Sequence, residues 1–324
     1  MKDVVFAYKG FNRDFTCRGF QYRVGETYEH RGKVKACVSG FHACVHPLDV
    51  LSYYAPATSR FAEVALSGEL SLASDDSKIA ASRITIEEEL PIHQLIDRAI
   101  KYVFDHAKQP QNTVNGYGAA ATASGHYNAA SAAGDCGIAT ASGRYNVASA
   151  IGEQGAATAT GYYSVASATG EKGAATATGH YSAVLAAGCC GTASASGHYS
   201  AALASGYCGA ASATGDSGAA SAAGDYGAAS ATGEYGAASA SGYYSAALVT
   251  SSGGAATASG RHSTAIATGR NSRASGKEGC ALFLVERDES WKIINVWTGI
   301  VGKDGIKPDV FYTLRDGKPV EVDG

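Results

Sequence analysis

The middle of the chain alternates small apolar and polar residues with a period of nine. Glycine occupies every ninth position from Gly116 to Gly269, with Ser251 as the one exception. When each glycine is counted as position 1, positions 6 and 8 from Ala121 to Ala267 hold alanine everywhere except Val184 and Val249. Side chains two residues apart share one face of a strand. The pattern therefore predicts one short strand per nonapeptide, with an alanine inner face.

A second period sets the length of one turn. Tyrosine recurs at position 3 every eighteen residues, at Tyr127, Tyr145, Tyr163, Tyr181 and Tyr199. Alternate nonapeptides therefore differ chemically, and one turn should hold two of them. This predicts a parallel β-solenoid over residues 113–276, with eighteen-residue coils and about 8.5 turns from seventeen glycine-led repeats.

The outward positions of the two kinds of nonapeptide differ. One kind presents a hydroxyl array at Thr140, Ser142, Thr158, Thr160, Thr176 and Thr178. This array is compatible either with an ordinary hydrated β-surface or with the Thr-x-Thr ladders of ice-binding solenoids. The other kind carries the aliphatic residues Val147, Ile151, Val165, Leu185 and Leu203. An exposed apolar stripe of this sort is typical of a contact surface, so it is a candidate for self-association or partner binding.

The flanking segments have ordinary globular patterns. Residues 1–112 predict an α+β domain, which ends in an amphipathic helix over Ile92–Ala107 between Pro91 and Pro110. Residues 277–324 predict a small β-meander that caps the solenoid. Apolar runs in the first domain predict strands at Val4–Tyr8, Phe20–Val24, Lys33–Val38 and Phe61–Leu66.

The densest group of reactive side chains lies in the first domain. Cys37, His42 and Cys44 are candidate metal ligands, with His46 beside them and Cys17 upstream. Cysteine and histidine are good zinc ligands, so a structural zinc is one interpretation, although this spacing is not that of a standard zinc knuckle. A second interpretation is that these are buried thiols beside a hydrogen-bonded histidine. A third is that Cys44 or Cys37 is a nucleophile with His42 as its base. No third group is present by motif, so we assign no catalytic residue and no other cofactor.

Charge narrows the classes of partner. Only eleven charged residues lie between Thr113 and Gly276, and the formal net charge of the whole chain is -3. The charge therefore argues against a nucleic-acid partner, and the sequence predicts neither a membrane-spanning segment nor a signal peptide. We expect a cytosolic protein in which the eight cysteines form no disulfide framework.

Both flanks resemble an uncharacterised family of proteins from tailed phages and prophages. The resemblance rests on CRGFQYRVGETYEH (Cys17–His30), SGFHACVHPLDVLSYY (Ser39–Tyr54) and, near the end, ALFLVERDESWKIINVWTGIVGKDGIKPDVFYTL. It implies a phage or prophage origin, in the host bacterial cytoplasm or in the virion, and a solenoid of variable repeat number. It implies no activity, catalytic residue or ligand.

These observations favour a non-enzymatic scaffold or interaction protein. Its rigid solenoid would mediate self-association, as a dimer or trimer, or bind a host protein, without a membrane partner. The main alternative is that the N-terminal domain is an enzyme or a ligand- or metal-binding module and the solenoid is a spacer. Ice binding by the hydroxyl array is a further alternative.

Overall fold

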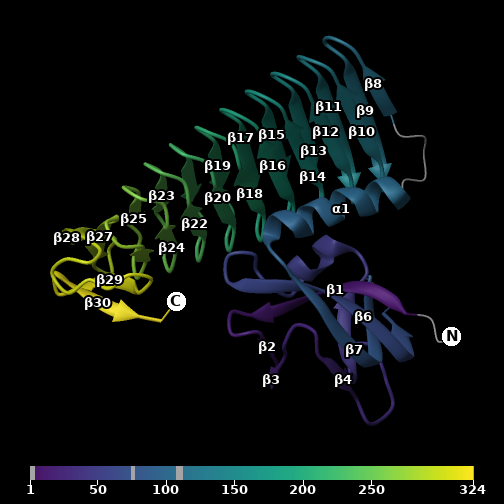
Figure 1. Cartoon of the computed structure of the whole chain (residues 1–324), viewed down its shortest axis with the longest axis horizontal. Coiled ribbons are helices and arrows are strands. Elements are labelled where there is room, and N and C mark those ends of the chain that lie inside the picture. Colours follow the sequence, from purple (N-terminus) through teal and green to yellow (C-terminus); the bar gives the residue numbers. More distant parts are fainter. Residues whose placement is uncertain (1–3, 74–76, 107–111, 324) are drawn as a thin grey trace. The chain divides into compact units, whose positions relative to one another are not determined.

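The computed structural model describes residues 4–73, 77–106 and 112–323, and it is mainly β. The chain divides into two compact units, Met1–Asp105 and His106–Gly324 (Figure 1). The predicted fold class, a parallel β-solenoid between an N-terminal domain and a C-terminal β cap, is confirmed.

The N-terminal unit is built on one antiparallel sheet in the order β4-β7-β5-β1-β6. Strands β6 and β7 also pair with each other, so the sheet closes on itself. Its core contains Phe11, Leu66 and Ile84, which are fully buried. The elements of this unit are β1 (Val5–Asn12), β2 (Thr16–Cys17), β3 (Phe20–Gln21), β4 (Thr27–Glu29), β5 (Phe41–Cys44), the 3₁₀ helix η1 (Pro47–Ser52), β6 (Ser59–Leu72), β7 (Lys78–Leu90) and α1 (Ile92–His106).

The predicted helix is confirmed, because α1 begins at Ile92 directly after Pro91 and buries Leu95, Ile96, Ala99 and Val103. The last residue of the prediction, Ala107, lies outside the described residues. Among the described residues, neither α1 nor any other helix is long and apolar enough to cross a membrane.

Two strand predictions in this unit are corrected. Residues 33–38 form a turn held by a single bridge between Lys35 and Ser39, because Cys37 takes a φ of 64° that a strand does not accommodate. Residues 20–24 contribute only the two residues of β3. Strand β7, which pairs with β4, β5 and β6, was not predicted.

The solenoid consists of two parallel sheets with one strand per nonapeptide. Each strand pairs with the strand one coil away, and Ala130 lies opposite Ala148, eighteen residues further on. The first sheet holds β8 (Asn112–Asn115), β10 (Ala129–Ala133), β12 (Val147–Ile151), β14 (Val165–Thr169), β16 (Ala183–Ala187), β18 (Ala201–Ala204), β20 (Ala219–Ala222), β22 (Ala237–Ala240), β24 (Ala255–Ala258) and β26 (Arg273–Gly276). The second holds β9 (Ala120–His126), β11 (Ile138–Arg144), β13 (Ala156–Thr160), β15 (Ala174–Thr178), β17 (Thr192–Ser196), β19 (Ala210–Ala213), β21 (Ala228–Ala231), β23 (Ala246–Val249), β25 (Thr264–Ala267) and β27 (Ala281–Arg287).

The parallel ladder is longer than the repeat pattern predicts, with about ten turns instead of about 8.5. At the first end β8 pairs with β10, and at the other end β27 pairs with β25 although it lacks the glycine and alanine pattern. The backbone ladder therefore continues into flanking sequence, because strand pairing needs backbone groups and not the repeat itself.

The predicted C-terminal meander is instead two hairpins, one on each sheet. Strand β28 (Ile293–Ile300) pairs antiparallel with β27, and β30 (Lys318–Val322) pairs antiparallel with β29 (Phe311–Arg315), which joins β26. Each parallel sheet thus ends in an antiparallel hairpin.

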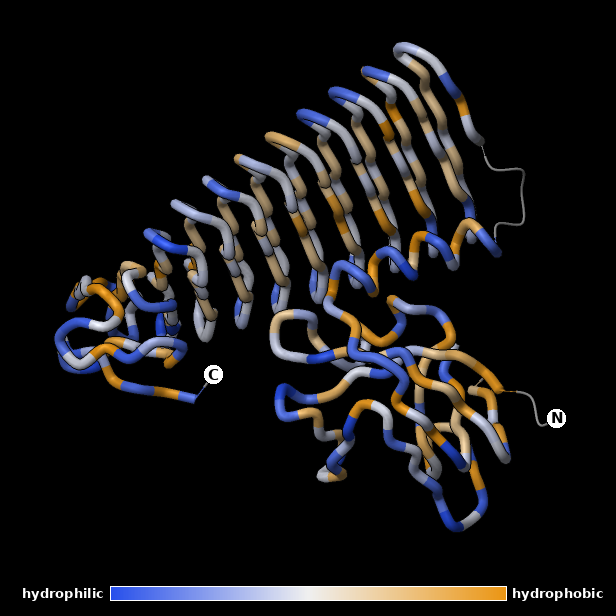
Figure 2. The backbone as a smooth tube through the Cα atoms, in the orientation of Figure 1, coloured by the Kyte–Doolittle hydropathy of each residue, from blue (hydrophilic) through white to orange (hydrophobic). Residues whose placement is uncertain are grey.

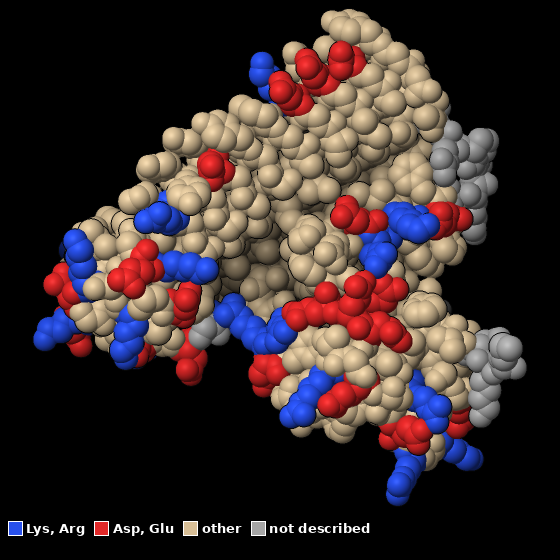
Figure 3. All heavy atoms as spheres, in the orientation of Figure 1, with Lys and Arg blue, Asp and Glu red and all other residues tan. Residues whose placement is uncertain are grey.

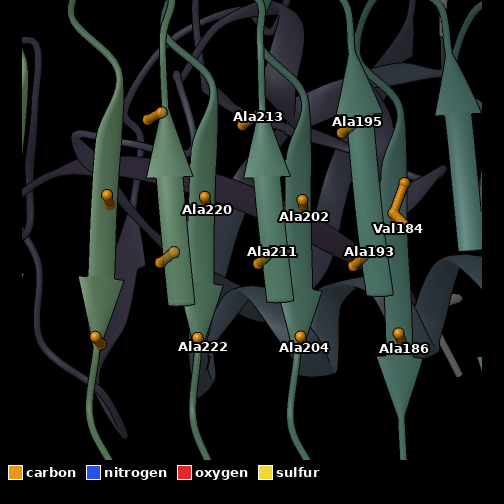
Figure 4. Packing of buried hydrophobic residues seen from close by; sticks show 14 of the residues in the cluster. Val184, Ala186, Ala193, Ala195, Ala202, Ala204, Ala211, Ala213, Ala220 and Ala222 are labelled. Carbon is orange, nitrogen blue, oxygen red and sulfur yellow. The ribbon is translucent and has the colours of Figure 1, made fainter. Parts of the chain in front are cut away.

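The solenoid core is a double row of alanines. Position 6 and 8 side chains from both sheets are almost completely buried and form one cluster along the rod. Figure 4 shows Ala193, Ala195, Ala211 and Ala213 of one sheet facing Val184, Ala202 and Ala220 of the other. Because alanine is so short, the two sheets pack at close range, and the hydropathy colouring places the polar residues of the repeat mostly at the corners (Figure 2).

The glycines at position 1 of successive nonapeptides, here called the glycine column, lie where neighbouring coils come close together. A Cβ built on Gly161 would lie 1.7 Å from the carbonyl oxygen of Gly143, one coil earlier. Gly161 also has a φ of +125°. The left-handed residue of each corner is, in contrast, usually position 3, and Tyr145 and Tyr163 have φ of 58° and 56°. From Gly134 onward the column is therefore needed for close approach of the backbones, and its members up to Gly188 also adopt a positive φ.

The tyrosines of position 3 form a stacked ladder, as the eighteen-residue period suggests. Ring centroids of successive residues from Tyr127 to Tyr199 lie 4.8 to 5.5 Å apart, and the planes differ by 11 to 15°. Offset stacking at this distance is favourable. Inside the same corner, position 4 is polar and buried, and the Ser182 hydroxyl donates to the Gly161 carbonyl at 3.1 Å.

Candidate functional site

The N-terminal unit contains a cavity of about 770 Å³ that is open to solvent. Strand β1 supplies Lys9 to its wall, the β2–β3 hairpin supplies Cys17, and β5 supplies His42. Aromatic residues form much of the remaining wall: Tyr8, Phe20, Tyr22, Phe41, Tyr53 and Tyr54. Most pockets that bind small molecules combine such an apolar wall with a few polar groups.

The charged residues of the cavity wall are all basic. Lys9, Arg18 and Lys78 line it, and among its described lining residues none is Asp or Glu. Figure 3 shows that charged side chains gather on the N-terminal unit and on the C-terminal cap, whereas the visible face of the solenoid carries few. The cavity therefore offers positive charge and aromatic surface together.

Lys9 is the most unusual of these groups because it is only 5% exposed. Its Nζ donates to the His42 carbonyl at 3.0 Å and to the Cys17 Sγ at 3.6 Å, and it lies 5.5 Å from the centre of the Phe11 ring. Of the ion pairs formed within the described ranges, none involves Lys9. Burial lowers the pKa of Lys9, and the nearby Cys17 acts in the opposite direction.

Cys17 receives a second hydrogen bond from the Tyr54 hydroxyl, at 2.9 Å. Tyr54 follows η1, and its backbone N–H donates to the Val50 carbonyl at 3.0 Å. The ring lies against β1 at Gly10, where a Cβ would come within 2.4 Å of it. Gly10 therefore lets Tyr54 reach the sulfur. Burial raises the pKa of Tyr54, so its hydroxyl stays protonated and remains a donor at neutral pH.

The three predicted metal ligands line this same cavity. His42 and Cys44 lie on β5, and Cys37 lies in the preceding turn, where it accepts a hydrogen bond from Lys78 Nζ at 3.4 Å. However, over residues 4–73, 77–106 and 112–323 no three His, Cys, Asp or Glu side chains are placed to hold a metal ion. The zinc site stays a prediction, and we build no function on it.

His42 and His46 have different surroundings. The His42 Nε2 is buried without a hydrogen-bond partner, and burial, with Lys9 nearby, lowers the pKa of this imidazole. His42 is therefore neutral at physiological pH. His46 lies outside the cavity wall, and its Nδ1 accepts from the Leu48 N–H at 3.2 Å at the start of η1. His46 thus has a structural role in capping.

The backbone around the cavity is strained at two non-glycine residues. Arg18 and Cys37 have φ of 50° and 64°. Arg18 and Gly19, with φ of 50° and 76°, form the tight turn that joins β2 to β3 and fixes Cys17 opposite Phe20. Left-handed residues other than glycine are uncommon and often occur at functional sites.

Sequence reasoning overlooked Lys9, Tyr54 and the aromatic wall. A signal for Lys9 exists, because Ala7, Lys9 and Phe11 occupy the inward positions of a strand and all three are buried. A lysine in register with core residues points to a buried cation.

On the solenoid, the hydroxyl array forms a regular ladder. Thr140, Thr158 and Thr176 lie in register on β11, β13 and β15, and Ser142, Thr160 and Thr178 form a second row. The aliphatic stripe is uneven: Val147 and Val165 are fully buried, Leu203 is 8% exposed, Leu185 is half-buried and Ile151 is 49% exposed. Only part of the predicted stripe is therefore exposed.

All eight cysteines are free thiols in the structure.

Comparison with known protein families places residues 5–98 in a domain family of unknown function, DUF7666. This domain covers the sheet, η1 and the cavity. No curated protein and no solved structure is detectably similar to the chain.

Proposed function

We propose that the N-terminal domain binds a small anionic ligand with a planar aromatic part, and that the solenoid is the rigid rod that carries this module. The observation that supports the proposal is the buried Lys9 ammonium in an aromatic cavity whose described lining includes no carboxylate. A buried cation without a counter-ion is costly, and an anion entering the cavity would relieve that cost. The phage origin and the scaffold role remain predictions from the sequence.

The aromatic rings define the rest of the ligand. Phe20, Tyr22 and Phe41 contact one another edge to face, with Phe20 and Tyr22 centroids 4.8 Å apart and Tyr22 and Phe41 centroids 6.3 Å apart. Such a cluster presents ring surfaces and edges on which a planar group can stack. A simple inorganic anion would leave this wall unused.

The binding of 2-naphthoate to the full chain tests this function. Isothermal titration calorimetry should detect binding of 2-naphthoate and much weaker binding of its uncharged analogue 2-naphthylmethanol. Lys9→Met should weaken 2-naphthoate by about 10- to 100-fold, the value of one charge-assisted hydrogen bond. Lys318→Met, on β30, is the matched control and should have no effect. Equal affinity for the two compounds, or no 2-naphthoate binding at millimolar concentration, would contradict the proposal.

We propose as a second function that the protein self-associates through β28. This strand is the last in its sheet, and Ile294, Val296 and Ile300 on it are 41 to 53% exposed. The last strand of the other sheet, β30, carries the usual protection of an edge in Lys318, Pro319 and Glu321. Only one of the two C-terminal edges is thus protected against strand pairing.

The partner that fits this edge is a second copy of β28 in antiparallel register. Pairing centred on Val296 brings Ile294 opposite Thr298 within the strand. Light scattering at micromolar concentration should show a dimer that Val296→Lys converts to a monomer. The control Val320→Lys, on the protected edge, should leave the dimer intact, and a wild-type monomer would refute the proposal.

A further inference from the structure

Cys17 has surroundings unlike those of the other seven cysteines. It ends β2, directly before the tight turn at Arg18 and Gly19, and it lines the cavity. Its sulfur accepts hydrogen bonds from Tyr54 at 2.9 Å and from Lys9 at 3.6 Å. A cysteine acts as a nucleophile in its anionic form, and cationic and hydroxyl donors stabilise negative charge on sulfur.

The other cavity thiols differ from Cys17 in their exposure. Cys37 is exposed and accepts a hydrogen bond from Lys78 Nζ at 3.4 Å. Cys44 is buried, whereas Cys17 is half-buried. Cys189, Cys190 and Cys208 lie at exposed corners of the solenoid. Cys136 is half-buried and Cys280 is buried, and none of these five residues lines the cavity of the N-terminal unit.

We propose that Cys17 is a nucleophile that forms a covalent bond with an electrophilic carbon of an anionic ligand held in this cavity. The inference rests on the proposed ligand site. In the step, the sulfur forms a bond to carbon, the bond from that carbon to its leaving group breaks, and the leaving group departs with the bonding electrons. The thiol proton passes to solvent. Lys9 and Tyr54 are positioning residues, and Lys9 also attracts the anionic group of the ligand.

Alkylation of the full chain by two reagents of different charge tests this inference. Iodoacetate is anionic and iodoacetamide is neutral, and both transfer a carbon to sulfur with loss of iodide. Peptide mass spectrometry gives the rate at each cysteine in one sample. The ratio of the iodoacetate rate to the iodoacetamide rate should be about tenfold or more higher at Cys17 than at Cys208, because a nearby cation binds the anionic reagent.

Variants separate the roles of the two donors. Lys9→Met should reduce the Cys17 ratio to that of Cys208, and Tyr54→Phe, which removes only the hydroxyl group, should slow Cys17 with both reagents. Tyr235→Phe and Lys318→Met, which lie outside this cavity wall, are the matched controls and should leave Cys17 unchanged. Circular dichroism checks that each variant is folded, and Tyr54→Phe keeps the test valid if Lys9→Met unfolds.

The result distinguishes the nucleophile from the ligand site. Equal ratios at Cys17 and Cys208, or a Cys17 rate that neither Lys9→Met nor Tyr54→Phe changes, would overturn the inference. If 2-naphthoate binds in a Lys9-dependent manner while Cys17 stays unreactive, only the nucleophile is refuted. If Cys17 prefers iodoacetate but 2-naphthoate does not bind, the nucleophile stands and the aromatic ligand is refuted.

Discussion

Replacing Gly161 by alanine tests the close approach of neighbouring coils. The new Cβ would lie 1.7 Å from the Gly143 carbonyl oxygen, and the φ of +125° is one that side-chain-bearing residues rarely adopt. The coil can accept the methyl group only if its backbone moves by more than an ångström. Gly155→Ala is the matched control, because its nearest contact would be the Ala150 side chain at 3.1 Å and its φ is outside the left-handed region.

The expected magnitude follows from two costs. The left-handed φ costs about 1–3 kcal/mol for a non-glycine residue. Displacing the backbone also weakens the hydrogen bond from the Gly161 N–H to the Thr178 carbonyl, 2.9 Å long, and an unsatisfied buried group costs about 1–3 kcal/mol. Gly161→Ala should therefore lose about 2–6 kcal/mol. Gly155→Ala should change the free energy of unfolding by less than about 1 kcal/mol, because lower entropy of the unfolded chain offsets the tight contact.

Hydrogen exchange followed by mass spectrometry is the suitable assay, because a repeat protein can open locally rather than in one step. Gly161→Ala should speed exchange in β13, β14 and β15 and leave β1 unchanged. The column does accept a side chain at Ser251, where φ lies outside the left-handed region and the hydroxyl donates to the Gly233 carbonyl at 2.5 Å. Equal protection in the two variants would refute the argument.

Three further predictions concern the N-terminal domain. Lys9→Met should stabilise the domain by about 1 kcal/mol while ligand affinity falls, because the buried ammonium pairs with no carboxylate among the described residues. A lower melting temperature in calorimetry would show a structural role instead. The affinity for 2-naphthoate should fall as pH rises through the lowered pKa of Lys9, because the ammonium then loses its charge, and this fall should occur at a lower pH than the titration of a surface lysine. Calorimetry across pH measures this dependence, and an affinity that does not change with pH would contradict it. The hydrogen bond from Arg60 lowers the pKa of Glu89, so this pair stabilises the fold above the ordinary pKa of glutamate and loses that effect as pH falls through the lowered pKa. In thermal melts, Glu89→Gln should therefore cost below about 1 kcal/mol of stability at pH 7 and nothing at pH 2. An equal cost at both pH values would contradict this prediction.

The sequence predicts the solenoid well because its determinants are local and repeated. Each coil repeats the choices of the last, so the register of Ala130 with Ala148 follows from the period alone. The ends are harder to predict, because β8 and β27 pair through their backbones without the repeat pattern. The split of the C-terminal hairpins between two sheets also depends on which edge each strand meets, which local sequence does not encode.

The cavity could be predicted only in part. The cysteine and histidine cluster pointed to the correct region, since Cys37, His42 and Cys44 all line the cavity. Lys9 and Tyr54 are far apart in the chain and meet Cys17 only after β1 pairs with β5 and β6. Composition carries no information on such long-range pairing, and the turn at Cys37 shows how a φ of 64° overrides a β-favouring run.

Because residues eighteen apart pair in register, the length of the solenoid rod changes in steps of one coil. A recombination event that removes one eighteen-residue unit rejoins strands of the same sheet, keeps every corner and shortens the rod by one strand spacing, about 4.8 Å. An event that removes nine residues joins strands of opposite sheets and interrupts the tyrosine ladder. Insertions and deletions of repeats should therefore occur in multiples of eighteen residues. The length of the rod can then change in evolution without any change to the cavity of the N-terminal domain.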